Sequence, residues 1–180
     1  MKGIIFNLLE SFIVENWGEK KYENIIGKSE LITTDPFVGP VSYPDFDIIE
    51  IIKKTAVAVK ISEEELLMRL GRYCIPKLKA RYPVFFERHK KAKDFLKTVD
   101  YIHYVEVVKL YKDATPPHFE CIDLGENKMT MIYHSQRQLC SFMMGLVEGV
   151  GDLYNEQIII KKDKCTLKGD DYCEVGLIFK

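Results

Sequence analysis

Two fragments of this chain carry side chains that bind metal ions and carboxylates. His103 lies in a run of helical character, and Tyr133, Ser135 and Arg137 form a Tyr-x-Ser-x-Arg pattern further along. A neutral imidazole is the usual axial protein ligand of haem iron. A Tyr, a Ser and an Arg that project from one segment supply the donors that two haem propionates require. In this order, the fragments predict a haem site held by one histidine and three polar side chains.

Each fragment also has an ordinary structural interpretation. A lone histidine on a helix more often satisfies a hydrogen bond than binds a metal. Ser135 is also expected as the N-cap of the helix that follows. This role is compatible with propionate binding, because a helix amino terminus is electropositive and carries free backbone donors. The chain has no Cys-x-x-Cys-His motif, so we expect the haem to be held without a covalent attachment.

The composition is that of one globular domain with a substantial core: 180 residues, 47% of them hydrophobic. A formal net charge of −1 gives no electrostatic reason to expect nucleic acid or an acidic membrane as a partner. No apolar run approaches the roughly 18 residues that span a bilayer. Five cysteines without an export signal favour reduced thiols or metal ligands over disulfides, and we expect a cytoplasmic protein.

Hydrophobic spacing predicts helices first and strands afterwards. The expected helices cover residues 4–13, 46–59, 63–73, 91–111 and 139–153. The expected strands cover residues 119–124, 128–133, 157–161 and 173–179. A capping box, Ser62 to Glu65, marks the start of the third helix, and Pro76 is expected to kink or end it. This order predicts an α+β fold, with an N-terminal helical subdomain followed by a C-terminal subdomain with an antiparallel sheet and a long helix.

His103, the Pro116–Pro117 pair and the segment from Tyr133 to Arg137, in this order and approximate spacing, resemble the H-NOX family of haem nitric oxide/oxygen binding domains, in its stand-alone bacterial form. The resemblance covers essentially the whole chain and implies a single domain over residues 1–180. It implies a distal helical part over about 1–62, a proximal α/β part over 63–180, and haem b between them. The family pattern places the prolines one residue closer to the histidine, and a local insertion or bulge after His103 would accommodate the difference.

The resemblance gives each of these residues a role. It implies His103 as the proximal ligand of the iron, and it implies three propionate-binding side chains: Tyr133, Ser135 and Arg137. Pro117 is expected to press on the porphyrin and distort it, because Pro-x-Phe-Glu-Cys resembles the family pattern best. Pro116 is the alternative for this contact.

The distal pocket decides which gas binds. By the resemblance, five residues line it: Ile5, Leu9, Cys74, Phe142 and Leu146. Ordinary core packing is the alternative for each of them. Oxygen-binding members carry a tyrosine donor at the position that Phe142 takes here, and losing a hydrogen bond of roughly 1.5–3 kcal/mol lowers oxygen affinity about 10- to 150-fold. We therefore expect selectivity for nitric oxide, with Tyr73 and Tyr154 as alternative donors.

Three cysteines form a separate group. Cys140, Cys165 and Cys173 resemble a zinc-binding cluster of some bacterial H-NOX proteins, which carry a histidine where this chain has Lys162. Zinc takes four ligands, and only three thiolates are evident here. A redox-active or merely buried thiol set is therefore the favoured interpretation, and zinc is the second.

The resulting prediction is a haem-based gas sensor without catalytic activity that binds nitric oxide and carbon monoxide. Because the resemblance takes up the chain, we expect its output on a separate partner: a histidine kinase, a cyclic-dinucleotide enzyme or a chemotaxis receptor. The alternative is a haem-free, vinyl-reductase-like domain that binds a small molecule or a partner, which would leave His103 and Arg137 without a task. A haem peroxidase is disfavoured, because we find no convincing distal His–Arg pair.

Overall fold

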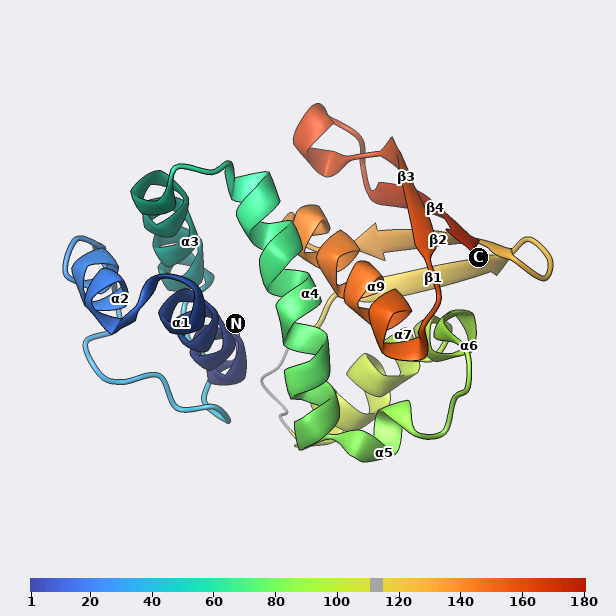
Figure 1. Cartoon of the computed structure of the whole chain (residues 1–180), viewed down its shortest axis with the longest axis horizontal. Coiled ribbons are helices and arrows are strands. Elements are labelled where there is room, and N and C mark those ends of the chain that lie inside the picture. The colour runs from blue at the N-terminus through green and yellow to red at the C-terminus, as the bar shows by residue number, and fades with distance from the viewer. Residues whose placement is uncertain (111–114) are drawn as a thin grey trace.

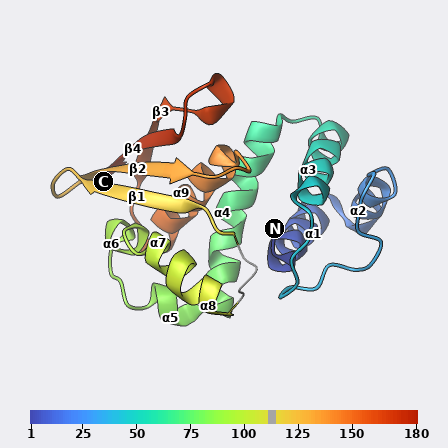
Figure 2. The same cartoon turned by 180° about the vertical axis from the view of Figure 1, so that it is seen from behind.

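The structure is a computed structural model that describes residues 1–110 and 115–180. A helical N-terminal part is followed by a four-stranded sheet with a helix across one face (Figures 1 and 2). The helices are α1 (Gly3–Trp17), α2 (Glu19–Ile26), α3 (Asp45–Val59), α4 (Glu63–Arg81), α5 (Pro83–Phe86), α6 (Ala92–Leu96), α7 (Val99–Tyr101), the π-helix η1 (Ile102–Val107), α8 (Val108–Leu110), α9 (Cys140–Tyr154) and the 3₁₀-helix η2 (Thr166–Lys168). The strands are β1 (His118–Asp123), β2 (Lys128–His134), β3 (Ile158–Lys164) and β4 (Cys173–Phe179). Their order is β1-β2-β4-β3 with every neighbouring pair antiparallel, so the α+β prediction is confirmed.

The long helix α4 lies between the two parts (Figure 1). Its start is set locally, because the Ser62 side chain accepts a hydrogen bond from the Glu65 N–H at 3.0 Å, which confirms Ser62 as the N-cap. The Glu65 carboxylate pairs with Arg69, so the second half of the predicted capping box is not formed. Pro76 lies inside the helix, which continues to Arg81, so the helix does not stop there as one expectation had it. The neighbours Cys74 and Ile75 are buried in the two cores, and this packing offsets the hydrogen bond that Pro76 cannot donate.

Helices α4 and α9 touch backbone to backbone. A Cβ atom on Gly145 of α9 would lie 2.1 Å from the Met68 carbonyl oxygen, and one on Gly71 of α4 would lie 2.4 Å from that of Phe142. Side chains at either position would push the helices apart, so the absence of a Cβ permits this approach. The crossing fixes where α9 meets the N-terminal part.

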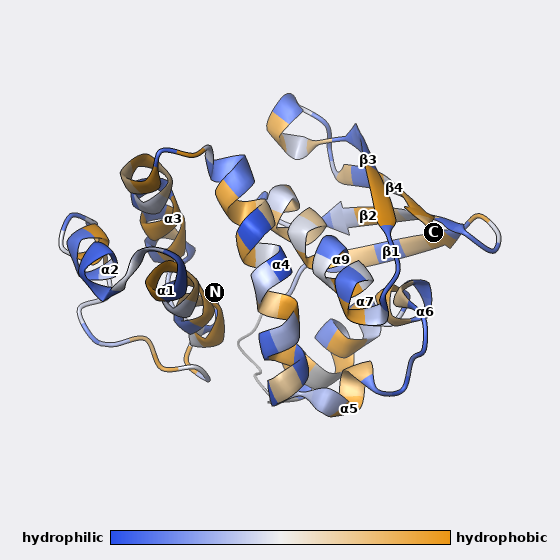
Figure 3. Ribbon diagram, viewed as in Figure 1, coloured by the Kyte–Doolittle hydropathy of each residue, from blue (hydrophilic) through white to orange (hydrophobic). Residues whose placement is uncertain are grey.

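Each part has a core of its own. The N-terminal core is built from α1, α3 and part of α4, with Ile13 and Leu66 fully buried. The C-terminal core fills the space between the sheet and α9, with Met131 and Leu177 at its centre. Figure 3 shows that the strands and helices α1 and α3 are rich in hydrophobic residues, whereas the loop between α5 and α6 is hydrophilic. Phe142 of α9 packs against the N-terminal core, so α9 serves both parts.

The expected continuous helix over residues 91–111 is wrong, because α6, α7, η1 and α8 replace it within the described residues. The π-helical segment η1 includes His103. A π-helix accommodates a residue in excess of the α-helical repeat, as an insertion or bulge after His103 would, and the link to the family spacing stays a prediction. Helices α2 and α5 were not predicted, since one is polar and the other is a single turn. The proposed division after residue 62 stays a prediction. Within the described residues, no helix has the length and apolar character to cross a membrane.

Candidate functional site

His103 is a half-buried residue whose imidazole carries one shielded nitrogen atom. Its Nδ1 atom is shielded from solvent and meets no hydrogen-bond partner among the described residues. Burial lowers the pKa of His103 to about 4, against the smaller opposing effect of Asp100. The side chain is therefore neutral near pH 7, which is the form that binds iron. An unsatisfied buried donor or acceptor costs about 1–3 kcal/mol, so this side chain fits a partner that the polypeptide does not supply.

Tyr133 and Ser135 stand where β2 gives way to the segment before α9. The Tyr133 ring is buried and packs on Phe119, with ring centroids 5.3 Å apart. The Ser135 hydroxyl accepts a hydrogen bond from the Arg137 N–H at 3.2 Å. The expectation that Ser135 is the N-cap of the following helix is wrong, because α9 starts at Cys140 and Leu139 takes the N-cap position. Ser135 instead shapes the turn that presents Arg137.

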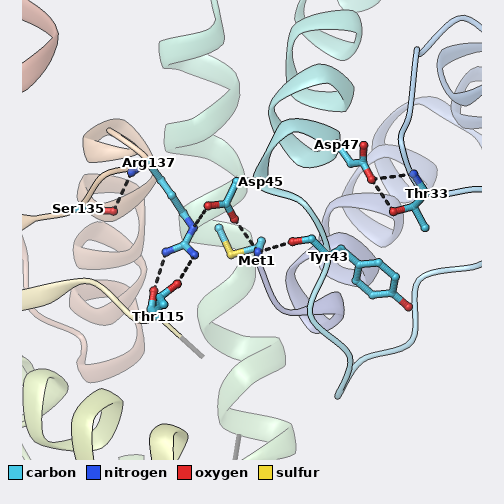
Figure 4. A network of polar contacts seen from close by, with 8 residues as sticks. All are labelled: Met1, Thr33, Tyr43, Asp45, Asp47, Thr115, Ser135 and Arg137. Carbon is cyan, nitrogen blue, oxygen red and sulfur yellow. Dashed lines mark hydrogen bonds and ion pairs between the residues drawn. The ribbon is translucent and has the colours of Figure 1, made fainter. Parts of the chain in front are cut away.

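Arg137 joins the two parts of the molecule (Figure 4). Its guanidinium donates to the Thr115 carbonyl at 2.7 Å and to the Thr115 hydroxyl at 2.8 Å, and its Nε lies 2.9 Å from Oδ2 of Asp45. Asp45 also accepts from the amino group of Met1 at 2.6 Å. Burial raises the pKa of Asp45, but the hydrogen bonds from that amino group and from Arg137 outweigh this and leave the pKa below its usual value. Arg137 thus already binds a carboxylate at this position.

The sequence did not reveal Asp45 as part of the site. It precedes the first hydrophobic residues of α3, where an acidic residue is ordinary because it complements the helix dipole. Nothing in its local pattern indicated a contact with Arg137, which is remote in the chain. Only the packing of α3 beside the segment before α9 reveals the pair.

The five expected distal residues come together. Ile5 and Leu9 of α1, Cys74 of α4, and Phe142 and Leu146 of α9 all belong to the N-terminal core cluster. Burial raises the pKa of the Cys74 thiol to about 12, so it stays neutral. The five residues form an apolar cluster without a charged side chain. Such a cluster suits a pocket for a diatomic gas and also suits ordinary core packing.

The two alternative donors differ. The Tyr154 hydroxyl donates to the Phe86 carbonyl at 2.7 Å and packs with the other core, so it is used elsewhere. The Tyr73 hydroxyl meets no partner of good hydrogen-bond geometry in the described part of the chain, but it lies beside the Glu15 carboxylate and the Lys77 ammonium, and both affect its pKa. Its ring packs on Phe12 of α1, with ring centroids 5.2 Å apart. The Tyr73 hydroxyl is therefore next to charged groups, and its role as an alternative donor stays a prediction.

Pro116 and Pro117 lead into β1 directly after Thr115, the residue that Arg137 binds, and both are partly exposed. The surface of the described residues includes a hollow of about 440 Å³ between α1 and α4 and another of about 450 Å³ beside α7 and β1. Neither is lined by His103 or by the five distal residues. The site is therefore marked by its side-chain chemistry and not by either hollow, and the choice between the prolines stays a prediction.

The three cysteines also come together. The sulfur atoms of Cys140, Cys165 and Cys173 lie within 4.8 Å of one another, and all three residues are buried. Burial raises the pKa of Cys165, but the Leu167 N–H, the Cys140 thiol and the Lys162 ammonium lower it by more. Lys162, at the position where zinc-binding relatives are expected to carry histidine, pairs with Glu64 at 2.8 Å. The cluster can hold a thiolate or a metal ion, and no fourth ligand is evident within the described residues.

Comparison with known proteins agrees with this arrangement. A family model described as Haem-NO-binding matches residues 2–162. An H-NOX protein from S. oneidensis in the Fe(II)NO ligation state is 24% identical, with a TM-score of 0.93 over 100% of this chain and 99% of that chain. An unliganded Fe(II) H-NOX mutant from K. algicida is 25% identical, with a TM-score of 0.91 over 100% of this chain and 97% of that chain. The resemblance drawn from His103 and Arg137 is confirmed at the level of the family: this chain belongs to the Haem-NO-binding family of gas-sensing haem domains.

Proposed function

We propose that this protein is a nitric-oxide-selective haem sensor that signals through a separate partner and catalyses no reaction itself. The observation that carries the proposal is the neutral imidazole of His103, whose Nδ1 atom is shielded from solvent and has no hydrogen-bond partner among the described residues. In the same fold, Arg137 holds a carboxylate group. One residue suits iron and the other suits a propionate.

Four side chains would hold haem b without a covalent attachment. His103 would bind the iron, while Tyr133, Ser135 and Arg137 would donate to the propionates. Each charge-assisted hydrogen bond of this kind contributes about 1.5–3 kcal/mol. Pro117, or Pro116 in its place, would contact the porphyrin. Ferrous haem supplies the iron on which a diatomic gas such as nitric oxide or carbon monoxide binds.

Selectivity would follow from the distal residues. Phe142 offers no donor, and Ile5, Leu9 and Leu146 are hydrocarbon side chains that cannot hydrogen-bond. Oxygen bound to ferrous haem gains from a donor, whereas nitric oxide depends on one much less. The neutral Cys74 thiol is at best a weak donor. The distal face of this chain thus favours nitric oxide over oxygen.

The contacts around His103 offer a route to the surface. Asp100 of α7, which precedes η1, accepts hydrogen bonds from the Phe119 N–H and from His118 Nδ1, both at 2.8 Å. A displacement of the His103 segment therefore pulls on β1. A partner responds only if it binds the two positions differently, and a 10-fold change needs about 1.4 kcal/mol of differential contact. A histidine kinase, a cyclic-dinucleotide enzyme and a chemotaxis receptor are the proposed partner classes.

The test is the visible spectrum of the purified, reduced protein under argon, nitric oxide, carbon monoxide and air. We expect a haem spectrum that changes with nitric oxide and carbon monoxide and does not change reversibly in air. A stable shift in air would contradict the proposed selectivity. Protein that binds no haem on reconstitution would favour the haem-free, vinyl-reductase-like alternative.

For the three cysteines we propose a redox-active or buried thiol set in a reducing compartment such as the cytoplasm. All three thiols are free, and the sulfur atoms of Cys140 and Cys165 are 3.6 Å apart. Zinc is the second proposal, because a fourth ligand would have to come from solvent or from a moved side chain.

A further inference from the structure

Two histidines face each other on the side of the sheet away from α9. In the antiparallel pair β1–β2, His118 lies directly opposite His134, and Phe119 lies opposite Tyr133. Because successive side chains on a strand point to opposite faces, Phe119 and Tyr133 enter the core while the two histidines point outward. The imidazole centroids are 5.8 Å apart, with ring planes inclined by 23°. Neither ring has a task in the proposed haem site.

A carboxylate converges on both rings. Glu120, two residues along β1 and on the same face, places Oε1 3.3 Å from His134 Nε2 and 3.8 Å from His118 Nε2. Two ligands of one Zn²⁺ ion, each about 2.0–2.1 Å from the metal, lie roughly 3.0–3.4 Å apart. One contact has this spacing, and the other exceeds it slightly. The three side chains are not preassembled as a metal-ligand group in the described part of the chain, as the three cysteines are. They are exposed by 56%, 39% and 53% for His118, His134 and Glu120, so they are free to change rotamer when an ion binds.

The other nitrogen of His118 is fixed by a second carboxylate. His118 Nδ1 lies 2.8 Å from Asp100 Oδ1, and the Phe119 N–H donates to the same oxygen at 2.8 Å. Because the carboxylate only accepts, Nδ1 donates to it, and Nε2 is the nitrogen of His118 that is left for another partner. A histidine oriented by a carboxylate is the usual outer-shell arrangement of metal-binding imidazoles.

We propose that His118, Glu120 and His134 form a surface site for a borderline divalent transition metal ion such as Zn²⁺ or Ni²⁺, with Asp100 positioning His118. Imidazole and carboxylate ligands suit these ions, whereas the cysteine cluster offers the softer thiolates. The nearby Lys164 is engaged by the Tyr172 hydroxyl at 2.5 Å and by Glu174 at 3.3 Å, so its charge is already balanced.

The proposed metal site lies at the ends of β1 and β2 that also carry proposed haem-binding residues. Pro117 directly precedes His118, and Tyr133 and Ser135 flank His134. A bound metal ion would tie β1 to β2 at this end, and through Asp100 it would tie both strands to α7, which precedes the His103 segment. Metal binding should therefore stabilise the fold and stiffen the supports of the haem site, although it touches no haem ligand.

The test is calorimetric titration of the full-length, untagged protein with Ni²⁺. We expect one bound ion per chain that His134→Gln weakens at least about 10-fold, with a similar loss in Glu120→Gln. Asp100→Asn should weaken binding about 10- to 100-fold, as loss of an outer-shell partner does. His89→Gln is the matched control, because His89 packs on Phe95 with ring centroids 6.0 Å apart and should leave binding unchanged.

Equal Ni²⁺ binding by the wild type, His134→Gln and Glu120→Gln would overturn the proposal, because any ion would then sit on the thiols or elsewhere. Absence of binding to the wild type at millimolar Ni²⁺ would overturn it too and leave protonated imidazoles as the counterions of Glu120. Far-UV circular dichroism of each variant checks the fold, and His134 is on the surface, where glutamine is tolerated. The readout does not involve haem, so the proposal and the sensor function can fail separately.

Discussion

The segment that carries His103 and the segment that carries Arg137 differ in how far the chain itself satisfies them. His103 sits on a π-helical turn with a buried nitrogen that no described group contacts. Arg137, in contrast, is bound by Thr115 and Asp45 (Figure 4). The segment of His103 has a nitrogen atom to which a group from outside the polypeptide can bind. The segment of Arg137 is already held by contacts within the chain. An external carboxylate at Arg137 must share it with Asp45 or displace it.

The largest expected effect comes from removing the unpartnered imidazole. His103→Gly should yield protein that holds little haem, because the variant lacks the imidazole that is proposed to bind the iron. Added imidazole should fill the space and restore the ferrous visible spectrum. His89→Gly is the matched control and should keep its haem. A normal ferrous spectrum of His103→Gly without imidazole would show that His103 is not the ligand.

The next largest effect concerns the distal residues, which include no strong hydrogen-bond donor. Phe142→Tyr places a hydroxyl among the distal residues and should raise oxygen affinity by about 10- to 150-fold, the equivalent of one hydrogen bond of 1.5–3 kcal/mol. Oxygen titration of the reduced variant measures this. Tyr73→Phe alone should leave the oxygen affinity of the reduced protein unchanged. A loss of oxygen affinity in Tyr73→Phe would identify Tyr73 as a donor and weaken the proposed selectivity.

Two variants separate the two proposed roles of Arg137, which are to bind a haem propionate and to pair with Asp45. Arg137→Leu removes both the proposed propionate donor and the link to Asp45, so it should accelerate haem loss to apomyoglobin and lower the melting temperature. Asp45→Asn removes only the link, so it should lower the melting temperature while haem loss stays near that of the wild type. Rapid haem loss from Asp45→Asn would show instead that Asp45 helps to hold haem.

The Asp45 contact also predicts a pH dependence. Its pKa is lowered in the folded protein, so the contact stabilises the fold above the ordinary carboxyl value of about 3.9 and loses this contribution as the pH falls below it. The melting temperatures of wild type and Asp45→Asn should therefore differ more at pH 7 than at pH 3. Because Asp45 is 39% exposed, solvent screens the effect and it should be modest. An unchanged difference would contradict the assignment.

The smallest expected effect concerns the cysteine cluster, which adjoins the segment of Arg137, since Cys173 pairs with Tyr133 across β2 and β4. Metal analysis should return no stoichiometric zinc, and a mild oxidant should join Cys140 to Cys165, which can be read by mass spectrometry. Haem binding should be unaffected. A content of one zinc ion per chain, released on oxidation, would contradict the thiol interpretation and support a zinc site at the three cysteines.

Much of the fold could be predicted because its signals are local. The N-cap at Ser62 and the strand expected over residues 128–133 depend on signals within a few residues, and both were confirmed. The division of the stretch before β1 into α6, α7, η1 and α8 was missed, because a helix with one residue in excess has nearly the same periodicity as a regular one. Ser135 was misassigned as a helix cap, because helix boundaries depend on backbone angles that residue type constrains only weakly.

The sequence by itself determined the chemistry that is available: an imidazole at His103, a guanidinium at Arg137 and the missing donor at Phe142. Their order and spacing were enough to indicate the family. Only the tertiary structure decided which groups meet. The pairing of Arg137 with Asp45, the convergence of three sulfurs and the approach of Glu120 to two histidines join elements that no local pattern connects. The tertiary structure also decided that α4 and α9 touch at Gly71 and Gly145. Burial by the surrounding residues lowers the pKa of His103 and keeps its imidazole neutral, which the residue type alone does not determine.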